Sequence, residues 1–182
     1  MPTFLERNPH IIVSMAIFDM DIYAPTKRAL ELVMPRLTKG SLLVFDELNC
    51  RHFPGETQAL HEVVPVDFNI TGCPIEKDHF LAAIAALLNG DLPLYPEYPV
   101  CTECRMRENN CLLIERGLPC CGPITVAGCD ARCPDLRVPC VGCRGPAAGA
   151  NLDSLVAVME EKGFSRPQLA ARLRTFAPGG VA

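Results

Sequence analysis

The sequence lacks tryptophan, and aromatic residues make up only 6% of its 182 residues. No apolar run approaches the ~18 residues that a membrane span requires, and the first ten residues do not have the pattern of a secretory signal peptide. The formal net charge is -4, so no excess of basic residues is available to meet phosphates. We therefore expect a cytoplasmic protein with a packed core, no membrane span and no nucleic-acid partner.

Cysteine, in contrast, is abundant, and its positions are uneven. Of the eleven cysteines, Cys50 and Cys73 are the two that precede residue 101, and the other nine fall between residues 101 and 143. Disulfides do not persist in a reducing cytoplasm. The concentration of thiols in this short segment therefore predicts metal binding.

The first third of the chain has the pattern of an α/β protein. The apolar stretches 10–18 and 41–45 are typical of buried parallel strands. Between them, helical spacing runs from Pro25 to Leu37 and is stopped by Lys39-Gly40, and a second helix is expected over 56–64. We interpret residues 1–64 as an α/β fragment.

A change of character follows residue 64. Alternation over 66–70 predicts a short strand, and residues 76–89 have the pattern of a helix that begins with polar residues, so His79 is expected at the surface. Residues 101–150 show no sustained periodicity, which predicts a loop-rich segment shaped by metal ligation. Two short helices are expected in the tail, over 152–162 and 166–175, and Asn151 or Asp153 is expected to cap the first helix. The chain is thus predicted to have three segments, 1–64, 65–150 and 151–182.

Eight of the cysteines form two groups of four, each with one C-x-x-C pair. The first group is Cys101, Cys104, Cys111 and Cys120, and the second group is Cys129, Cys133, Cys140 and Cys143. Four thiolates suit either a tetrahedral zinc or a 4Fe–4S cluster, and a single C-x-x-C per group favours the cluster. The nearby arginines either offset the thiolate charge or are ordinary surface charges: Arg105, Arg107, Arg132 and Arg144.

The strings 120–134 (CCGPITVAGCDARCP) and 139–146 (PCVGCRGP) resemble the C-terminal half of the small subunit of cytosolic nickel–iron hydrogenases. That family belongs with the 20 kDa subunit of NADH:quinone oxidoreductases, and the resemblance covers about residues 65–151. It implies a distal 4Fe–4S cluster on the first group, a medial 4Fe–4S cluster on the second, and no ligand role for Cys121. It also implies an electron-transfer oxidoreductase subunit that is not catalytic alone, with a nickel–iron large subunit and a redox partner subunit.

Residues 71–74, Thr-Gly-Cys-Pro, match a further element of the same family. There the cysteine is the last ligand of a third, proximal cluster, whose other three ligands come from an N-terminal half that begins with C-x-x-C. Cys50 is the one cysteine before Cys73 here. Cys73 is thus an orphan, part of a site completed elsewhere, or inert.

The first 64 residues resemble a different family, the C-terminal part of macrocin-type sugar O-methyltransferases. The resemblance rests on residues 18–26, on 44–48 and on the stretch 53–64 (FPGETQALHEVV). It implies that Asp19, Asp46 and Glu47 match carboxylates that bind a divalent cation in that family, and oxygen ligands at strand ends suit such an ion. The alternative is that these acids simply end strands at a solvated edge.

The glycine-rich turn that would bind S-adenosylmethionine is not found before residue 19. Besides electron transfer, three other interpretations of the chain remain open. The chain could be a zinc-binding structural or interaction module, an incomplete metal-dependent sugar O-methyltransferase, or a non-functional fusion of two incomplete proteins.

Overall fold

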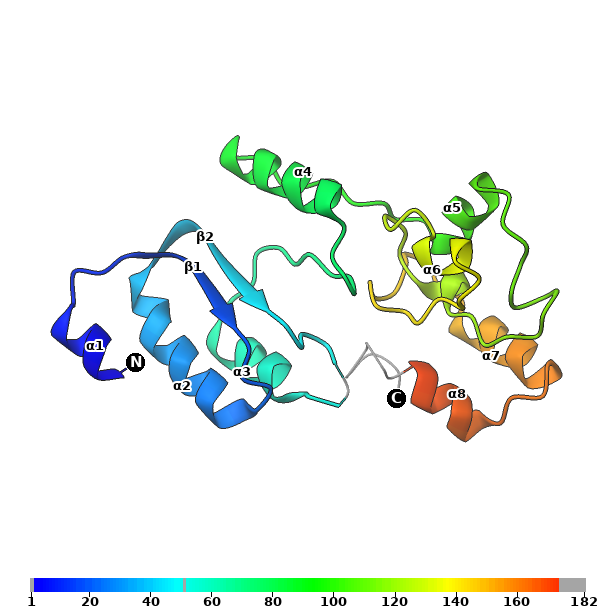
Figure 1. Ribbon diagram of the computed structural model, residues 1–182, viewed down its shortest axis with the longest axis horizontal. Coiled ribbons are helices and arrows are strands. Elements are labelled where there is room, and N and C mark those ends of the chain that lie inside the picture. Colours follow the sequence, from blue (N-terminus) through cyan, green and yellow to red (C-terminus); the bar gives the residue numbers. More distant parts are fainter. Residues whose placement is uncertain (1, 51, 174–182) are drawn as a thin grey trace. The chain divides into compact units, whose positions relative to one another are not determined.

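The computed structural model describes residues 2–50 and 52–173 and divides the chain into two compact units. The first unit is Met1–Asn69 and the second is Ile70–Ala182. The sequence pattern predicts a boundary after residue 64, a few residues earlier. Figure 1 shows the helices and strands of each unit, coloured along the chain.

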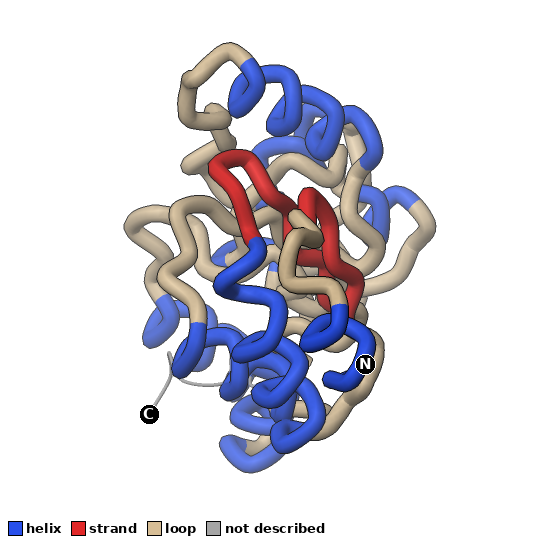
Figure 2. Tube along the Cα trace, turned by 90° about the vertical axis from the view of Figure 1, so that its left-hand side faces the viewer, coloured by secondary structure: helices blue, strands red, loops and turns tan. Residues whose placement is uncertain are grey.

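The first unit is a small α/β arrangement built on two parallel strands, β1 (Val13–Phe18) and β2 (Leu37–Phe45). The strands are joined by α2 (Tyr23–Val33) and the 3-10 turn η1 (Met34–Arg36), and α3 (Gly55–Val63) follows β2. A short helix, α1 (Pro2–Arg7), precedes β1. Figure 2 shows the two strands side by side. The structure thus confirms the predicted α/β character, with a sheet of two strands within the described residues.

One face of this sheet carries the core of the unit. Phe18 of β1 stacks on Phe45 of β2 with ring centroids 4.7 Å apart, and both pack against Leu30 of α2 and Ala59 of α3. Alternate residues point to the opposite face, where Met15 is 51% and Ile17 is 71% exposed. The apolar sequence of β1 predicts a strand buried on both sides, but the structure buries one face of it.

Two details of the first unit differ from the sequence-based prediction. The helix predicted to reach Leu37 ends at Val33, because Pro35 cannot continue an α-helix, and Leu37 begins β2 instead. Lys39-Gly40, predicted as the helix stop, lies inside β2, where the register with β1 is irregular and Gly40 has a φ of +87°. The strand predicted over 66–70 is not formed.

The second unit is loop-rich and contains five short helices in its described part, together with the 3-10 turn η2 (Gly122–Ile124). The helices are α4 (Lys77–Leu88), α5 (Val100–Met106), α6 (Arg132–Asp135), α7 (Leu152–Glu161) and α8 (Arg166–Leu173). Helices α4 and α7 lie within a residue of their predicted positions, and Asn151 caps α7 by accepting the Ser154 amide at 2.9 Å. Helix α8 begins at residue 166 as predicted, and residues 174–175 of its predicted range lie outside the described part of the chain. In residues 2–50 and 52–173, no helix is long and apolar enough to cross a membrane.

Backbone hydrogen bonds join three loop segments at the centre of the second unit. The amides of Val100 and Ala127 bond to the carbonyls of Thr125 and Tyr98, and those of Val126 and Ala147 bond to Gly145 and Ile124. The core lies against these segments. It includes Val100, buried cysteines, and Leu155, Met159 and Leu169 of α7 and α8, so the two C-terminal helices belong to this unit.

Glu56, on α3, joins the ends of the two strands in the first unit. Its side chain is fully buried, and its two carboxylate oxygens accept the amides of Met20 at 2.8 Å, Asp21 at 3.3 Å and Glu47 at 3.4 Å. These amides follow β1 and β2 directly. A carboxylate that accepts several backbone N–H groups is well suited to burial.

We predict that Glu56→Gln destabilises the first unit by about 2 kcal/mol, because an amide nitrogen cannot accept the backbone N–H groups. Hydrogen exchange measured by mass spectrometry should show faster exchange at residues 20, 21 and 47. Glu62→Gln is the matched control, since Glu62 is exposed and bonds to Lys27 and Tyr23 instead. Equal exchange in the two variants would contradict the prediction.

Candidate metal centre

The structure brings the four cysteines of the first group together. Cys101 and Cys104 lie on α5 with the i, i+3 spacing that places two side chains on one helix face. The thiol of Cys101 interacts electrostatically with those of Cys104, Cys111 and Cys120. A Cβ added at Gly122 would lie 3.3 Å from the Cys101 sulfur and 3.5 Å from the Cys120 sulfur. The glycine thus leaves room between two predicted ligands.

Burial favours the protonated form of two of these thiols, Cys101 and Cys104, in the metal-free chain. Burial raises the pKa of Cys101 to about 12, and the neighbouring thiols of Cys120, Cys104 and Cys111 contribute to that increase. The pKa of Cys104 is also raised, chiefly by burial. Since the thiolate is the form that binds metal, loading this group releases protons and depends on the positive charge that the metal brings.

The second group lines a small cavity of its own. Cys129, Cys133, Cys140 and Cys143 all contribute to its wall, and Cys73 lines the same cavity. Cys129 and Cys133 lie on either side of the start of α6, whereas Cys140 and Cys143 lie on the loop that follows it. The cavity therefore collects the thiols that the sequence pattern assigns to the second group, and adds a fifth.

Backbone amides near two sulfurs of this group favour their thiolate forms. The amides of Arg132 and Ala131 act to lower the pKa of Cys129, and that of Gly142 acts to lower the pKa of Cys140. Burial raises the pKa of both thiols, that of Cys140 to about 12, and these amides act against the increase. Nearby amide N–H groups stabilise the thiolate, which is the form of cysteine that binds metal.

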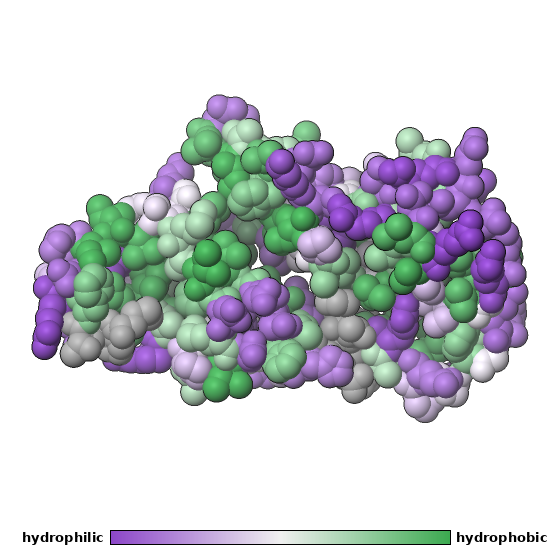
Figure 3. All heavy atoms as spheres, viewed as in Figure 1, coloured by the Kyte–Doolittle hydropathy of each residue, from purple (hydrophilic) through white to green (hydrophobic). Residues whose placement is uncertain are grey.

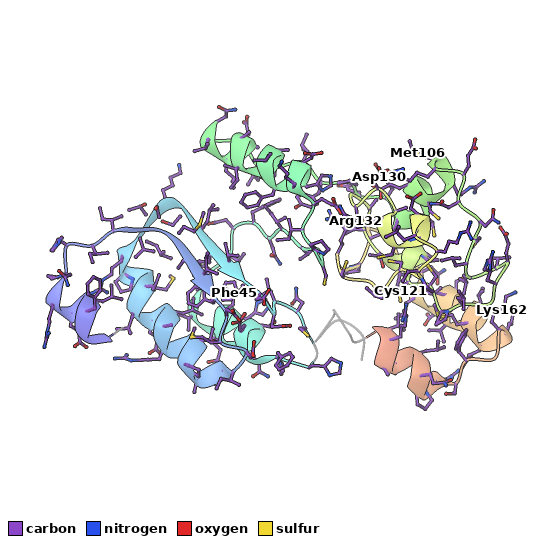
Figure 4. The ribbon with its side chains drawn as sticks, in the orientation of Figure 1. Phe45, Met106, Cys121, Asp130, Arg132 and Lys162 are labelled. Carbon is purple, nitrogen blue, oxygen red and sulfur yellow. The ribbon has the colours of Figure 1, made fainter. Side chains whose placement is uncertain are left out.

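The two cysteine groups contact each other. The backbone amide of Cys140 donates to the sulfur of Cys120 at 3.3 Å, and the amide of Cys121 donates to the carbonyl of Cys140 at 2.9 Å. Cys121 is 1% exposed, and burial raises the pKa of its thiol, with the charge of Arg172 acting against that increase. Figure 4 shows Cys121 within the loops of the second unit. All eleven cysteines are free thiols.

The four arginines near the cysteines differ in their surroundings. Arg144 is 3% exposed and donates to the carbonyls of Ala127 at 2.9 Å and Thr71 at 3.0 Å. It lies next to Cys143, and its charge lowers the pKa of Cys129 against the larger effect of burial. Arg144 is thus a buried cation beside the second group, as the charge-offset interpretation predicts.

The other three arginines lie at the surface. Arg107 pairs with Asp130 at 2.5 Å and Arg132 pairs with Glu76 at 2.6 Å. Figure 4 shows Asp130 and Arg132 on the second unit. Arg105 is exposed but its charge still lowers the pKa of Cys101 slightly. These three arginines are therefore exposed, and two of them form ion pairs with acidic side chains.

Two residues that support the site have no strong signal in the sequence. Glu103 on α5 accepts the amides of Gly128 at 2.6 Å and Ala131 at 3.0 Å, and so fixes the turn that carries Cys129. His79, predicted at the surface, is partly buried instead. Its Nδ1 lies 3.2 Å from Nη2 of Arg144, and its ring meets that of Tyr95 edge-on at 5.6 Å. Helical periodicity cannot reveal the contacts of Glu103 or of His79, because their partners lie outside the helices that carry them.

The acidic residues of the first unit stand where the sequence predicts, at the ends of β1 and β2. Asp19 and Asp46 are exposed and Glu47 is partly buried, with its amide bonded to Glu56. In the part of the chain that the structure describes, no three histidine, cysteine, aspartate or glutamate side chains are arranged to hold a single metal ion. Binding of a divalent cation by these acids stays a prediction.

Comparison with known proteins finds hydrogenase subunits. The chain is 40% identical over 116 residues to sulfhydrogenase 2 subunit delta of Pyrococcus furiosus, covering 64% of this chain and 48% of that protein. It is 34% identical over 151 residues to a subunit of the F420-non-reducing hydrogenase of Methanothermobacter thermautotrophicus, covering 67% and 49%. The iron-sulfur subunit of the F420-non-reducing hydrogenase of Archaeoglobus profundus is 30% identical over 128 residues, covering 55% and 40%.

The chain spans about half the length of the curated relatives it matches. No family model matches it. Among solved structures, the chain is similar to CalS11, the TDP-rhamnose 3'-O-methyltransferase of calicheamicin biosynthesis. The identity is 40%, the TM-score is 0.37, and the match covers 42% of this chain and 33% of CalS11.

We predict that Arg144→Met lowers the free energy of unfolding of the chain by about 3 kcal/mol, because it leaves buried carbonyls of Thr71 and Ala127 without their donor. The measurement is urea unfolding under anaerobic conditions. Arg107→Met removes a more exposed arginine and should cost about 1 kcal/mol or less. A similar cost for the two substitutions would show that burial of Arg144 does not stabilise the unit.

Gly128→Ala offers a second test of the same contact. Gly128 has a φ of +107°, and an added Cβ would collide with the His79 ring and approach Nη2 of Arg144 to 2.7 Å. Gly149 also has a positive φ, +67°, but an added Cβ there would meet nothing within 4 Å. We therefore expect Gly128→Ala to lower the thermal midpoint clearly more than Gly149→Ala. Equal midpoints would mean that His79 and Arg144 do not restrict this position.

Proposed function

We propose that the second unit holds two 4Fe–4S clusters and serves as an electron-transfer subunit of a nickel–iron hydrogenase or a related oxidoreductase. In this proposal Cys101, Cys104, Cys111 and Cys120 hold one cluster, and Cys129, Cys133, Cys140 and Cys143 hold the other. Its partners would be a hydrogenase large subunit and a redox partner subunit. A reducing cytoplasm is the compartment in which eleven free thiols persist.

The observation that carries this proposal is the arrangement of the eight cysteines. The first group gathers around Cys101, and the second lines one cavity. A 4Fe–4S cluster takes one thiolate at each of its four irons, so its ligands surround a volume rather than meet at a single ion. The similarity to hydrogenase subunits, one of them named as an iron-sulfur subunit, supports the same conclusion.

The contact between the groups supports a relay. The amide of Cys140, a predicted ligand of one cluster, donates to the sulfur of Cys120, a predicted ligand of the other. A path between the two centres would therefore run from the Cys120 sulfur across one hydrogen bond to the Cys140 amide, and then through covalent bonds to the Cys140 sulfur. The protein makes no bond to a substrate in this role. It positions the clusters, and its amides and the buried Arg144 adjust their potentials.

Metal analysis separates this proposal from a zinc-binding module, the other function that four thiolates allow. We expect the anaerobically purified chain to be brown, with a broad visible absorbance that bleaches on reduction, and to contain about eight iron and eight sulfide per chain. Cys104→Ala and Cys133→Ala, one from each group, should each remove about half of the iron. A colourless protein with stoichiometric zinc would overturn the proposal.

A further inference from the structure

Cys73 lies beside the second cysteine group. It lines the same cavity as Cys129, Cys133, Cys140 and Cys143, although it precedes them by more than fifty residues. Its side chain is exposed, whereas those four are partly or fully buried. The cavity therefore has five thiols around it, one more than a 4Fe–4S cluster requires.

Among the four cysteines, Cys143 is the one whose chain neighbour, Arg144, bonds to the segment that carries Cys73. Burial is the main cause that raises the pKa of Cys143, and the backbone amide of Cys73 acts against that increase. The thiols of Cys129, Cys73 and Cys133 contribute to the increase, as expected for cysteines that line one cavity.

A double hydrogen bond holds the two segments in this position. The hydroxyl of Thr71 donates to the carbonyl of Arg144 at 2.8 Å, and Nη1 of Arg144 donates to the carbonyl of Thr71 at 3.0 Å. Thr71 lies two residues from Cys73, and Arg144 follows Cys143 directly. Because Arg144 is 3% exposed, this contact is an internal part of the second unit and not a loose surface encounter.

We propose that Cys73 is a reserve ligand of the second group and replaces Cys143 when the Cys143 sulfur is lost. Cys73 then binds the iron that Cys143 held, and its thiol proton passes to the departing Cys143 sulfur or, where that sulfur is absent, to water. One iron–sulfur bond forms and one breaks, and no electron is gained or lost. The inference rests on the proposed function, since it requires a cluster in the cavity.

The test compares alanine variants of the full chain, purified anaerobically. We expect Cys73→Ala and Cys143→Ala each to keep about the eight iron of the wild type, and the double variant to lose about half. Cys111→Ala is the matched control from the first group. The spare thiol next to that group, Cys121, is buried in the core of the unit and its amide is fixed to the Cys140 carbonyl, so we expect this variant to lose about half of its iron.

A second measurement follows Cys73 itself and does not depend on yield. Iodoacetamide labelling with peptide mass spectrometry should modify Cys73 in the wild type, where it holds no iron, and should modify it at least about tenfold more slowly in Cys143→Ala. Cys50, in the first unit, should react equally in both proteins. The cysteines of the first group should stay protected, which shows that the variant is folded.

The outcomes distinguish the two proposals. A wild-type chain without iron overturns the proposed function and this inference with it. Iron in the wild type, with Cys143→Ala losing as much as the double variant, overturns the reserve ligand alone. Cys73 that stays as reactive in Cys143→Ala as in the wild type has the same consequence. Retained iron together with protected Cys73 supports the inference.

Discussion

The burial of Arg144 constrains the loops around the second cysteine group. Its guanidinium bonds to the carbonyls of Thr71 and Ala127, lies over the Tyr95 ring at 5.5 Å and faces His79. A buried cation is stable only where such partners surround it. The loop that carries Cys73, the turn before Cys129 and the segment after Cys143 must therefore converge on this side chain. The second cysteine cavity lies at that convergence.

The two cysteine groups are separate in the sequence but joined in the fold. Glu103, next to Cys104 on α5, holds the turn that carries Cys129, and the Cys140 amide bonds to the Cys120 sulfur. Each group thus depends on an element that belongs to the other. Helix α4 contributes little to the hydrophobic core, because Ala83 is its one buried residue. Its hydrophobic side chains are instead visible at the surface in Figure 3.

Local elements could be predicted from the sequence because their causes are local. The helix over 77–88, the Asn151 cap and the parallel strands follow from periodicity, capping and apolar runs. Helical spacing misplaces the end of α2, since Pro35 and the pairing of Leu37 with Val13 outweigh it. The strand expected over 66–70 has no neighbour to pair with among the described residues and does not form. The buried role of Glu56 needs three amides from distant loops, which no pattern in α3 reveals.

The sequence by itself determined which residues are available to bind metal: nine thiols in a short segment, eight of them in two groups of four whose spacing predicts the ligand sets. Only the tertiary structure decided how these thiols are arranged. It placed the second group around its own cavity, added Cys73 to that cavity and linked the groups through Cys120 and Cys140. The physical reason is that residue type and spacing indicate which cysteines can bind metal, whereas hydrogen bonds between loops bring those cysteines close together. Those bonds, from Arg144 and Glu103 above all, join residues far apart along the chain.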